Sequence, residues 1–123
     1  MITVIGMLEN GWESNMEHLV WRQLKGAWRF NLVLVPIDHP TLEEALAANE
    51  GERVFLIPPG RTPSIDLRDY RPPEGDVVYV FGRPGENLVR YVRDDDAVVS
   101  IATPGATDMM AISVVGIVLN ECR

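Results

Sequence analysis

The sequence predicts an α/β fold: a five- to six-stranded parallel sheet with helices on both faces. Apolar runs rich in β-branched residues recur along the chain, and helical patterns lie between most of them. The runs are almost continuously apolar, which is typical of strands that are covered on both faces. The chain has 123 residues, of which 46% are hydrophobic. That is enough for a core, so we expect residues 1–123 to form a single domain.

Five of these runs are long enough to be strands of the expected sheet. Each is rich in valine, isoleucine, leucine or aromatic residues, and most are bounded by polar residues, proline or glycine. The predicted strands are, in chain order, Ile2–Leu8, Asn31–Val35, Arg53–Ile57, Asp76–Phe81 and Ala97–Ile101.

The first predicted helix lies between the first two strands. Residues Glu13–Trp28 carry apolar side chains at helical spacing, and Asn10 or Ser14 is a candidate N-cap. A second, short helix follows Thr41, because Thr41 and Glu44 have the spacing of a capping box. We expect it to end near residues 49–51, where asparagine and glycine form an ordinary helix stop.

The segment Pro58–Gly75 predicts a long ordered loop. It contains five prolines, which prevent most regular structure. It begins directly after a predicted strand, where ligands bind in α/β proteins. A short helix is expected over Glu86–Arg93, followed by an acidic turn.

The terminal helix, expected over about Thr107–Glu121, is apolar around almost its whole circumference. Two interpretations are open. The helix lies wholly inside the monomer, or one face packs on the sheet and another in a homodimer. We favour the homodimer.

The charge balance argues against a broad phosphate-binding surface. The chain has 11 basic and 18 acidic residues and a formal net charge of −7. A small local patch is still compatible with this balance, since ten of the eleven cations are arginines, which favour bidentate contacts with phosphate or carboxylate. The chain lacks a membrane-length apolar run and a signal peptide, so we expect a cytoplasmic protein.

The sequence gives little support for a metal site, a nucleophilic hydrolase or base stacking by tryptophan. His18 and His39 lack the spacing of metal ligands, so we predict no metal. The serines lack a nucleophile elbow, and the single cysteine, Cys122, has no implied base beside it. Trp21 and Trp28 are expected to pack against the sheet or a partner copy rather than to stack on bases.

Two motifs in the second half carry a family resemblance. Residues 81–88 read FGRPGENL directly after an apolar strand, and residues 99–105 read VSIATPG before the terminal helix, which ends in VLNE. Strand, glycine turn, short helix, strand, Pro-Gly loop and terminal helix follow in an order that resembles the SPOUT superfamily of knotted methyltransferases, in particular its SpoU-type branch. The likeness covers almost the whole chain.

The resemblance implies a fold, a cofactor and a partner. The C-terminal segment would thread through a loop to form a trefoil knot, and two copies would dimerise through the terminal helix. S-adenosylmethionine would bind between the loops 58–60, 82–85 and 101–105, with Ile57, Ile101 and Met109 as apolar walls for its adenine. The cofactor-binding residues implied in this way are Pro58, Gly60, Gly82, Arg83, Gly85, Ile101, Thr103, Gly105 and Met109.

The implied reaction is methylation of a ribose 2′-hydroxyl of RNA, with tRNA as the expected substrate. Arg22 aligns near the family's arginine that assists deprotonation, and Asp108 at the start of the terminal helix is a candidate proton acceptor. The sequence departs from the family at the aligned arginine, where Gln23 stands next to Arg22, and at the second glycine of the glycine turn, which is Asn87 here. It also departs at two further places. Pro84 replaces the glutamate of the glycine turn, and Asp108-Met109-Met110 replaces Ser-Leu-Asn.

Two other hypotheses follow from these departures and from the fold class. One is a knotted protein that binds S-adenosylmethionine or a related nucleotide without methyl transfer. The other is a flavodoxin-like or similar nucleotide-binding module with an open sheet and no knot.

Overall fold

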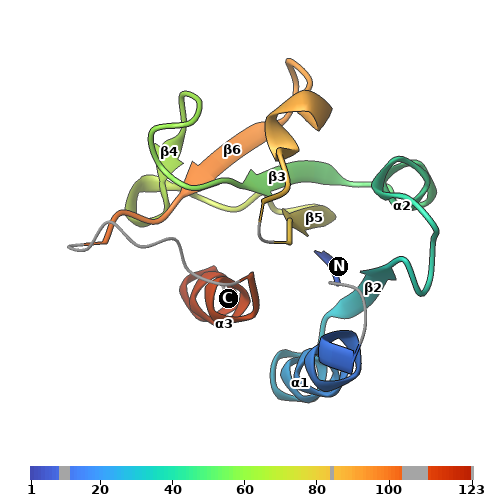
Figure 1. The fold of residues 1–123 in the computed structure, drawn as a ribbon. Coiled ribbons are helices and arrows are strands. Elements are labelled where there is room, and N and C mark those ends of the chain that lie inside the picture. Colours follow the sequence, from blue (N-terminus) through green and yellow to red (C-terminus); the bar gives the residue numbers. More distant parts are fainter. Residues whose placement is uncertain (9–11, 84, 104–110, 123) are drawn as a thin grey trace.

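The computed structural model describes residues 1–8, 12–83, 85–103 and 111–122. These residues form an α/β fold around one six-stranded sheet, in which every pair of neighbouring strands is parallel (Figure 1). The strand order is β2-β1-β5-β3-β6-β4. The strands are β1 (Ile2–Met7), β2 (Asn31–Val35), β3 (Glu52–Leu56), β4 (Ile65–Asp66), β5 (Val77–Phe81) and β6 (Ala97–Ser100). The five predicted strands are therefore confirmed, with ends that shift by one residue.

Helices cover both faces of the sheet, as predicted. The helices α1 (Trp12–Trp28) and α3 (Ala111–Glu121) pack on one face, and α2 (Leu42–Ala48) packs on the other. Two 3-10 turns, η1 (Leu67–Asp69) and η2 (Leu88–Tyr91), join the α1 face and the α2 face respectively. Side chains of β5 alternate between the two resulting cores, because neighbouring residues of a strand point to opposite faces.

The core on the α1 face is built around Trp21. This indole is completely buried, meets the ring of Phe81 edge-on at a centroid distance of 6.3 Å, and lies over Gly6 of β1. A Cβ atom at Gly6 would lie only 2.6 Å from the indole, so glycine is what allows this helix to approach the sheet so closely. Val115 and Val118 of α3 are also completely buried in this core.

The helix α2 starts as the sequence predicted. The Thr41 hydroxyl accepts a hydrogen bond from the backbone N–H of Glu44 at 3.2 Å, which is the N-cap contact expected from the motif. The helix α1 begins at Trp12, so Ser14 lies inside it and is not its cap, whereas Asn10 lies outside the described residues.

Three segments differ from the prediction. The expected loop over residues 58–75 contains the strand β4 and the turn η1, because Asp66 supplies a cap for the turn by accepting a hydrogen bond from the Arg68 N–H. The expected helix over residues 86–93 is only η2, capped by Asn87. The terminal helix is described from Ala111, and its predicted start at Thr107 lies outside the described residues.

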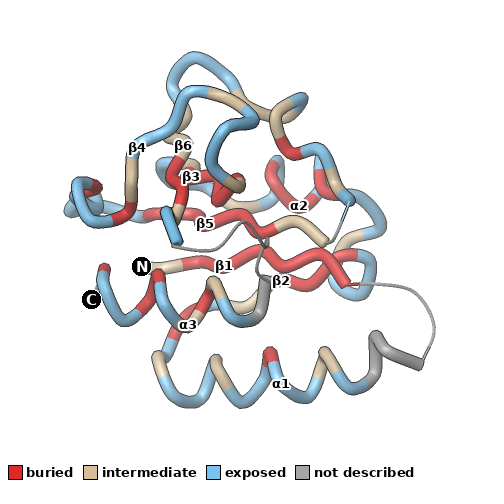
Figure 2. Tube along the Cα trace, turned by 60° about the vertical axis from the view of Figure 1, so that its left-hand side comes forward, coloured by how far each residue is buried: buried red, intermediate tan, exposed pale blue. Residues whose placement is uncertain are grey.

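The terminal helix is not wholly inside the monomer. Ile117 is 39% exposed, and Ser113 and Asn120 are also exposed, whereas Val115 and Val118 are buried. On the neighbouring helix α1, Met16, Leu19 and Val20 are exposed as well. Figure 2 shows the outer side of α1 as a largely exposed surface. We refer to Met16, Leu19, Val20 and Ile117 as the α1–α3 apolar patch.

Candidate functional site

The carboxyl ends of four neighbouring strands meet at one edge of the sheet. Phe81 of β5 pairs with Gly6 of β1 on one side and with Leu56 of β3 on the other, and Leu56 pairs with Val99 of β6. The strands β1, β5, β3 and β6 thus end at the same level. This carboxyl edge is where ligands bind in open parallel sheets.

The three loops predicted to hold a cofactor all begin at this carboxyl edge. The segments 58–60, 82–85 and 101–105 follow β3, β5 and β6, which are adjacent strands although they are distant in the sequence. Of the nine predicted cofactor-binding residues, Gly105 and Met109 lie outside the described residues, and so do Pro84 and the predicted proton acceptor Asp108. The other seven lie in these three adjacent loops.

Glycines shape two of the loops. Gly60 and Gly85 have φ angles of +89° and +81°, a conformation that side-chain-bearing residues rarely adopt, and both are exposed. Gly82 is half-buried, and a Cβ atom there would lie 3.2 Å from Leu88 Cγ and 3.3 Å from Glu86 Cβ. The turn after β5 is therefore folded tightly onto η2, as a loop that presents backbone groups requires.

Arg83 joins the ends of β1 and β5. Its Nη1 donates a hydrogen bond to the carbonyl oxygen of Leu8 at 3.1 Å, and its Nη2 lies 3.7 Å from Glu86 Oε1. Both side chains are partly buried. The connection after β1 runs to β2 at one side of the sheet, whereas the connection after β5 runs toward β6 at the other side. Arg83 therefore spans the point where the strand order reverses.

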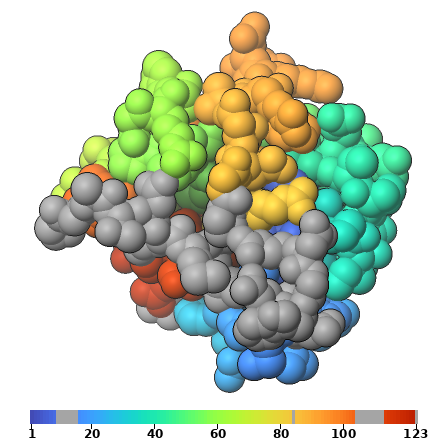
Figure 3. All heavy atoms as spheres, viewed as in Figure 1, coloured from blue at the N-terminus to red at the C-terminus, as the bar shows by residue number. Residues whose placement is uncertain are grey.

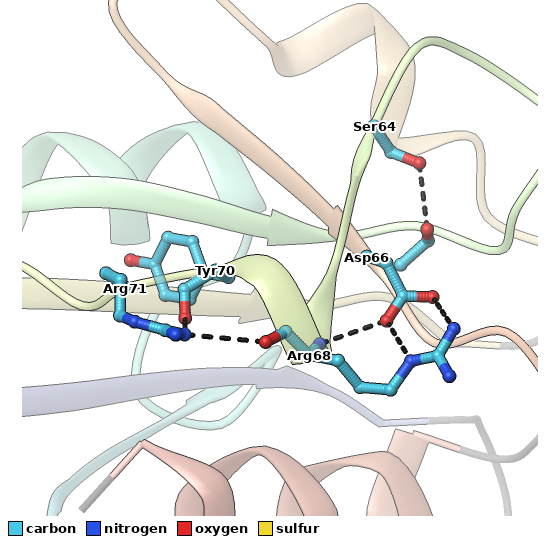
Figure 4. Close-up of polar contacts among 6 residues, drawn as sticks. Ser64, Asp66, Arg68, Tyr70 and Arg71 are labelled. Atoms are coloured by element: carbon cyan, nitrogen blue, oxygen red, sulfur yellow. Dashed lines mark hydrogen bonds and ion pairs between the residues drawn. The ribbon is translucent and has the colours of Figure 1, made fainter.

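The connection between β3 and β4 spans the end of β6. The strands β3 and β4 flank β6 in the sheet, and residues 57–64 join them at the carboxyl edge. The hydroxyl of Ser64 donates to the hydroxyl of the buried Ser100 at 2.8 Å, which fixes this connection to the last residue of β6 (Figure 4). The connection 57–64 is therefore attached to the carboxyl end of β6.

Asp66 adds a second attachment, which joins η1 to the segment after β6. Its carboxylate accepts hydrogen bonds from the backbone N–H and the side-chain Nε of Arg68, both at 3.0 Å (Figure 4). The hydrogen bond from the Arg68 side chain is the main cause that holds the pKa of this carboxyl below its ordinary value, and a backbone hydrogen bond from Ala102 lowers it further. Asp66 thus links η1 to the segment that follows β6.

Two predicted arrangements are not found. Ile57 is buried in the core on the α2 face, whereas Ile101 packs against the core on the α1 face, so they do not form facing walls of one pocket. Arg22 is exposed on α1, ten residues after the helix start and thus about 15 Å along its axis from that end. Its Nε donates to His18 Nε2 at 2.8 Å. Within one chain, the structure does not bring Arg22 to the carboxyl edge.

The role of Leu8, which directly follows β1, was not predicted from the sequence. The Leu8 carbonyl accepts the hydrogen bond from Arg83. The sequence feature that marks this residue is the end of the first apolar run at Leu8. Ser64 and Asp66 were not predicted either, because a strand of two residues leaves no periodicity in a proline-rich segment.

The donor set at the carboxyl edge fits a small zwitterionic cofactor. It combines glycine backbone at residues 60, 82 and 85 with one guanidinium, Arg83, and one carboxylate, Glu86. S-adenosylmethionine carries a carboxylate and two cationic groups, which match these charges in sign. No group of three or more histidine, cysteine, aspartate or glutamate side chains suited to a metal ion occurs in the described part of the chain.

None of the helices in the described ranges combines the length and the apolar character that crossing a membrane requires. No protein-family model matches the chain, and no curated protein matches it either.

Proposed function

We propose that this chain is a cytoplasmic, homodimeric methyltransferase of the SPOUT type. In this proposal it transfers the methyl group of S-adenosylmethionine to a ribose 2′-hydroxyl of RNA, with tRNA as the substrate class to test first. The single observation that carries the proposal is the convergence of three separate loops, 58–60, 82–85 and 101–103, at one edge of a parallel sheet. The family resemblance assigns the cofactor to the same three loops.

The topology also favours a threaded C-terminal segment. The connection 57–64 bridges the two strands that flank β6, and the chain leaves β6 at that bridge before it forms α3 on the α1 face. A chain that passes under this connection forms the knot that the resemblance implies. The strand order also differs from the order 2-1-3-4-5 of flavodoxin-like folds, because β5 lies between β1 and β3.

The proposed chemistry assigns a role to few side chains. When bound, S-adenosylmethionine supplies an electrophilic methyl group on a sulfonium sulfur. The ribose oxygen forms the new O–CH3 bond, the S–CH3 bond breaks, and the hydroxyl proton passes to a base. Arg83 and Glu86 would hold the charged end of the cofactor, Asp108 would receive the proton, and Arg22 would hold the RNA phosphate or assist deprotonation.

The α1–α3 apolar patch supports the proposed homodimer. Met16 and Leu19 are 59% and 65% exposed, and Ile117 of the neighbouring helix α3 is 39% exposed. Large apolar side chains gathered on two packed helices are typical of an interface between copies. Arg22 lies one helical turn after Leu19, so a second copy on this patch would have Arg22 at its border.

Calorimetric titration with S-adenosylmethionine and S-adenosylhomocysteine tests the proposal. We expect saturable binding near one ligand per chain or per dimer. The variant Arg83→Gln should weaken binding by about tenfold, because a charged hydrogen-bond donor is lost. Arg29→Gln is the matched control, since Arg29 is exposed at the end of α1, far from the carboxyl edge in the chain and in the fold. No binding at millimolar ligand would reject the cofactor site.

A second candidate function is cofactor binding without methyl transfer. Two observations favour it. Pro84 and Asp108-Met109-Met110 replace polar side chains of the family pattern. Arg22 lies away from the carboxyl edge within one chain. Nucleoside mass spectrometry of RNA from cells with and without the gene separates the two functions. An enzyme leaves a methylated nucleoside that disappears with the gene or with Arg22→Ala. A binding protein leaves no difference.

A further inference from the structure

A concave site lies on the α2 face, away from the carboxyl edge. A cavity of about 340 Å³ is lined by α2, by the first residues of β3, and by η2 with the residues after it. Its volume is at the lower end of the range for small-molecule sites. In Figure 3 the surface of α2 adjoins that of residues 88–96. Its lining includes Glu43, Arg53, Arg90, Tyr91, Val92 and Arg93. We call this cavity the α2–η2 groove.

The groove is a local basic site in an acidic chain. Three arginines and one glutamate line it, which gives a net charge of about +2, whereas the whole chain has a net charge of −7. Three of the ten arginines are thus gathered at one cavity. Such a cluster is the small local patch that the overall charge balance leaves room for.

In the described part of the structure, the guanidinium groups of Arg53 and Arg90 donate to uncharged oxygens. Arg53 Nη2 donates to the Leu46 carbonyl at 3.3 Å, and Arg90 Nη2 donates to the Tyr91 hydroxyl at 2.7 Å. The Asp96 carboxylate accepts the backbone N–H of Arg93 rather than its side chain. No ion pair joins any of the three to a carboxylate among the residues that the structure describes. Most of their N–H donors therefore remain available to a ligand.

The rest of the lining suits the sugar and base of a nucleotide. Leu46, Ala47 and Val92 give the groove an apolar surface, and Tyr91 adds a ring beside which the Arg90 guanidinium lies at 4.8 Å from the centroid. Phosphate is the anion that clustered arginines bind best, because each guanidinium makes paired hydrogen bonds to its oxygens. Aromatic and guanidinium planes are also the groups on which bases stack.

We propose that the α2–η2 groove binds the phosphate of a nucleotide through Arg53, Arg90 and Arg93, with its sugar and base against Tyr91 and Val92. The ligand is a free nucleoside monophosphate or a nucleotide unit of single-stranded RNA, which share this chemistry. The site is separate from the carboxyl edge and does not depend on methyl transfer. If both sites function, RNA binds on the α2 face and the cofactor binds separately at the carboxyl edge.

Titrations with inorganic phosphate, adenosine monophosphate and a five-residue oligouridylate test this proposal. We expect both nucleotides to bind at least about tenfold more tightly than inorganic phosphate at low salt. Equal affinity for the two nucleotides identifies the free nucleotide as ligand, and tighter binding of the oligonucleotide identifies RNA. The absence of nucleotide binding at millimolar concentration, or equal affinity for phosphate and nucleotides, would overturn the proposal.

Paired variants locate the binding in the groove. The double variant Arg90→Gln/Arg93→Gln should weaken nucleotide binding by at least about tenfold, because it removes two charged donors. The control Arg29→Gln/Arg71→Gln removes the same charge at exposed positions outside the groove and should change affinity less than twofold. Equal losses in both variants would show nonspecific attraction and overturn the proposal. Binding of S-adenosylmethionine should be unchanged by Arg90→Gln/Arg93→Gln, so failure of the groove and failure of the cofactor site are distinguishable.

Discussion

Gly6 and Trp21 form a close contact between α1 and the sheet. The glycine is the fifth of the six residues of β1, where it pairs with Leu34 on one side and Phe81 on the other. The indole occupies the space that a side chain at residue 6 would take. Neither β1 nor α1 can move away without opening a core in which the surrounding residues are also buried.

We therefore expect Gly6→Ala to destabilise the protein. The added methyl group would lie 2.6 Å from a rigid ring, so the free energy of unfolding should fall by about 1–3 kcal/mol, as measured by urea denaturation. Gly26→Ala is the matched control, because a Cβ atom there meets nothing within 4 Å. Alanine at that helical position should leave stability unchanged or raise it by about 0.5–1 kcal/mol. Equal effects of the two substitutions would contradict the role of the contact.

The sequence could not reveal this contact. Apolar spacing predicted the helix α1 but not its buried side, because Met16, Leu19 and Val20 are exposed. Trp21 was correctly expected to pack on the sheet or a partner. The reason for a glycine inside an apolar strand depends on which residue of another element lies above it. That information exists only in the folded chain.

The elements η1, β5 and α3 surround a group of buried polar side chains. Tyr70, Tyr79 and Cys122 come from or directly follow these three elements and lie in one core. Both tyrosine hydroxyls are buried without a hydrogen-bond partner in the described part of the structure. Burial raises the pKa of Tyr70 to about 12, and it also raises the pKa of Tyr79 and of the Cys122 thiol.

This cluster predicts a loss of stability at high pH. The three groups are acids whose pKa is higher in the folded chain than in the unfolded chain, so folding favours their neutral forms. Their contribution is complete below their ordinary pKa values of 9.0 and 10.0 and is lost as the pH rises toward about 12. The free energy of unfolding in urea, measured from pH 8 to pH 12, should fall over this window.

The variant Tyr70→Phe should reduce that dependence on pH, since it removes one of the acids. Tyr91→Phe, a half-buried tyrosine outside the cluster, is the control and should behave as the original chain does. An unchanged slope in Tyr70→Phe would show that alkaline unfolding arises elsewhere.

Elements with long, regular patterns were predictable, and short ones were not. The apolar runs of β1 and β5 and the capping box of α2 correspond closely to the structure, because each depends on residues near one another in sequence. The strand β4 depends on pairing with β6, which lies more than 30 residues later in the chain. The sequence of residues 58–75 therefore contains no pattern that predicts this strand. The same holds for the Ser64–Ser100 contact at the candidate site.

For the whole molecule, the α1–α3 apolar patch predicts a homodimer. The mass in solution should be that of two chains, and Leu19→Glu should shift it to one chain at the same concentration, because a two-fold contact would bring two buried charges together. Ile37→Glu is the control, since Ile37 is also large, apolar and 52% exposed but lies outside the patch. A monomeric original chain, or an unchanged mass in Leu19→Glu, would rule out this interface.

The order of the strands has a consequence for synthesis on the ribosome. Both neighbours of β3 in the sheet, β5 and β6, follow it in the chain. After Leu56 has been made, 25 further residues must be added before Phe81 completes the first of these neighbours. At about 5–20 residues per second, the apolar strand β3 therefore waits about one to five seconds without a partner. During this interval its unpaired edges are open to pairing with another chain, which favours aggregation.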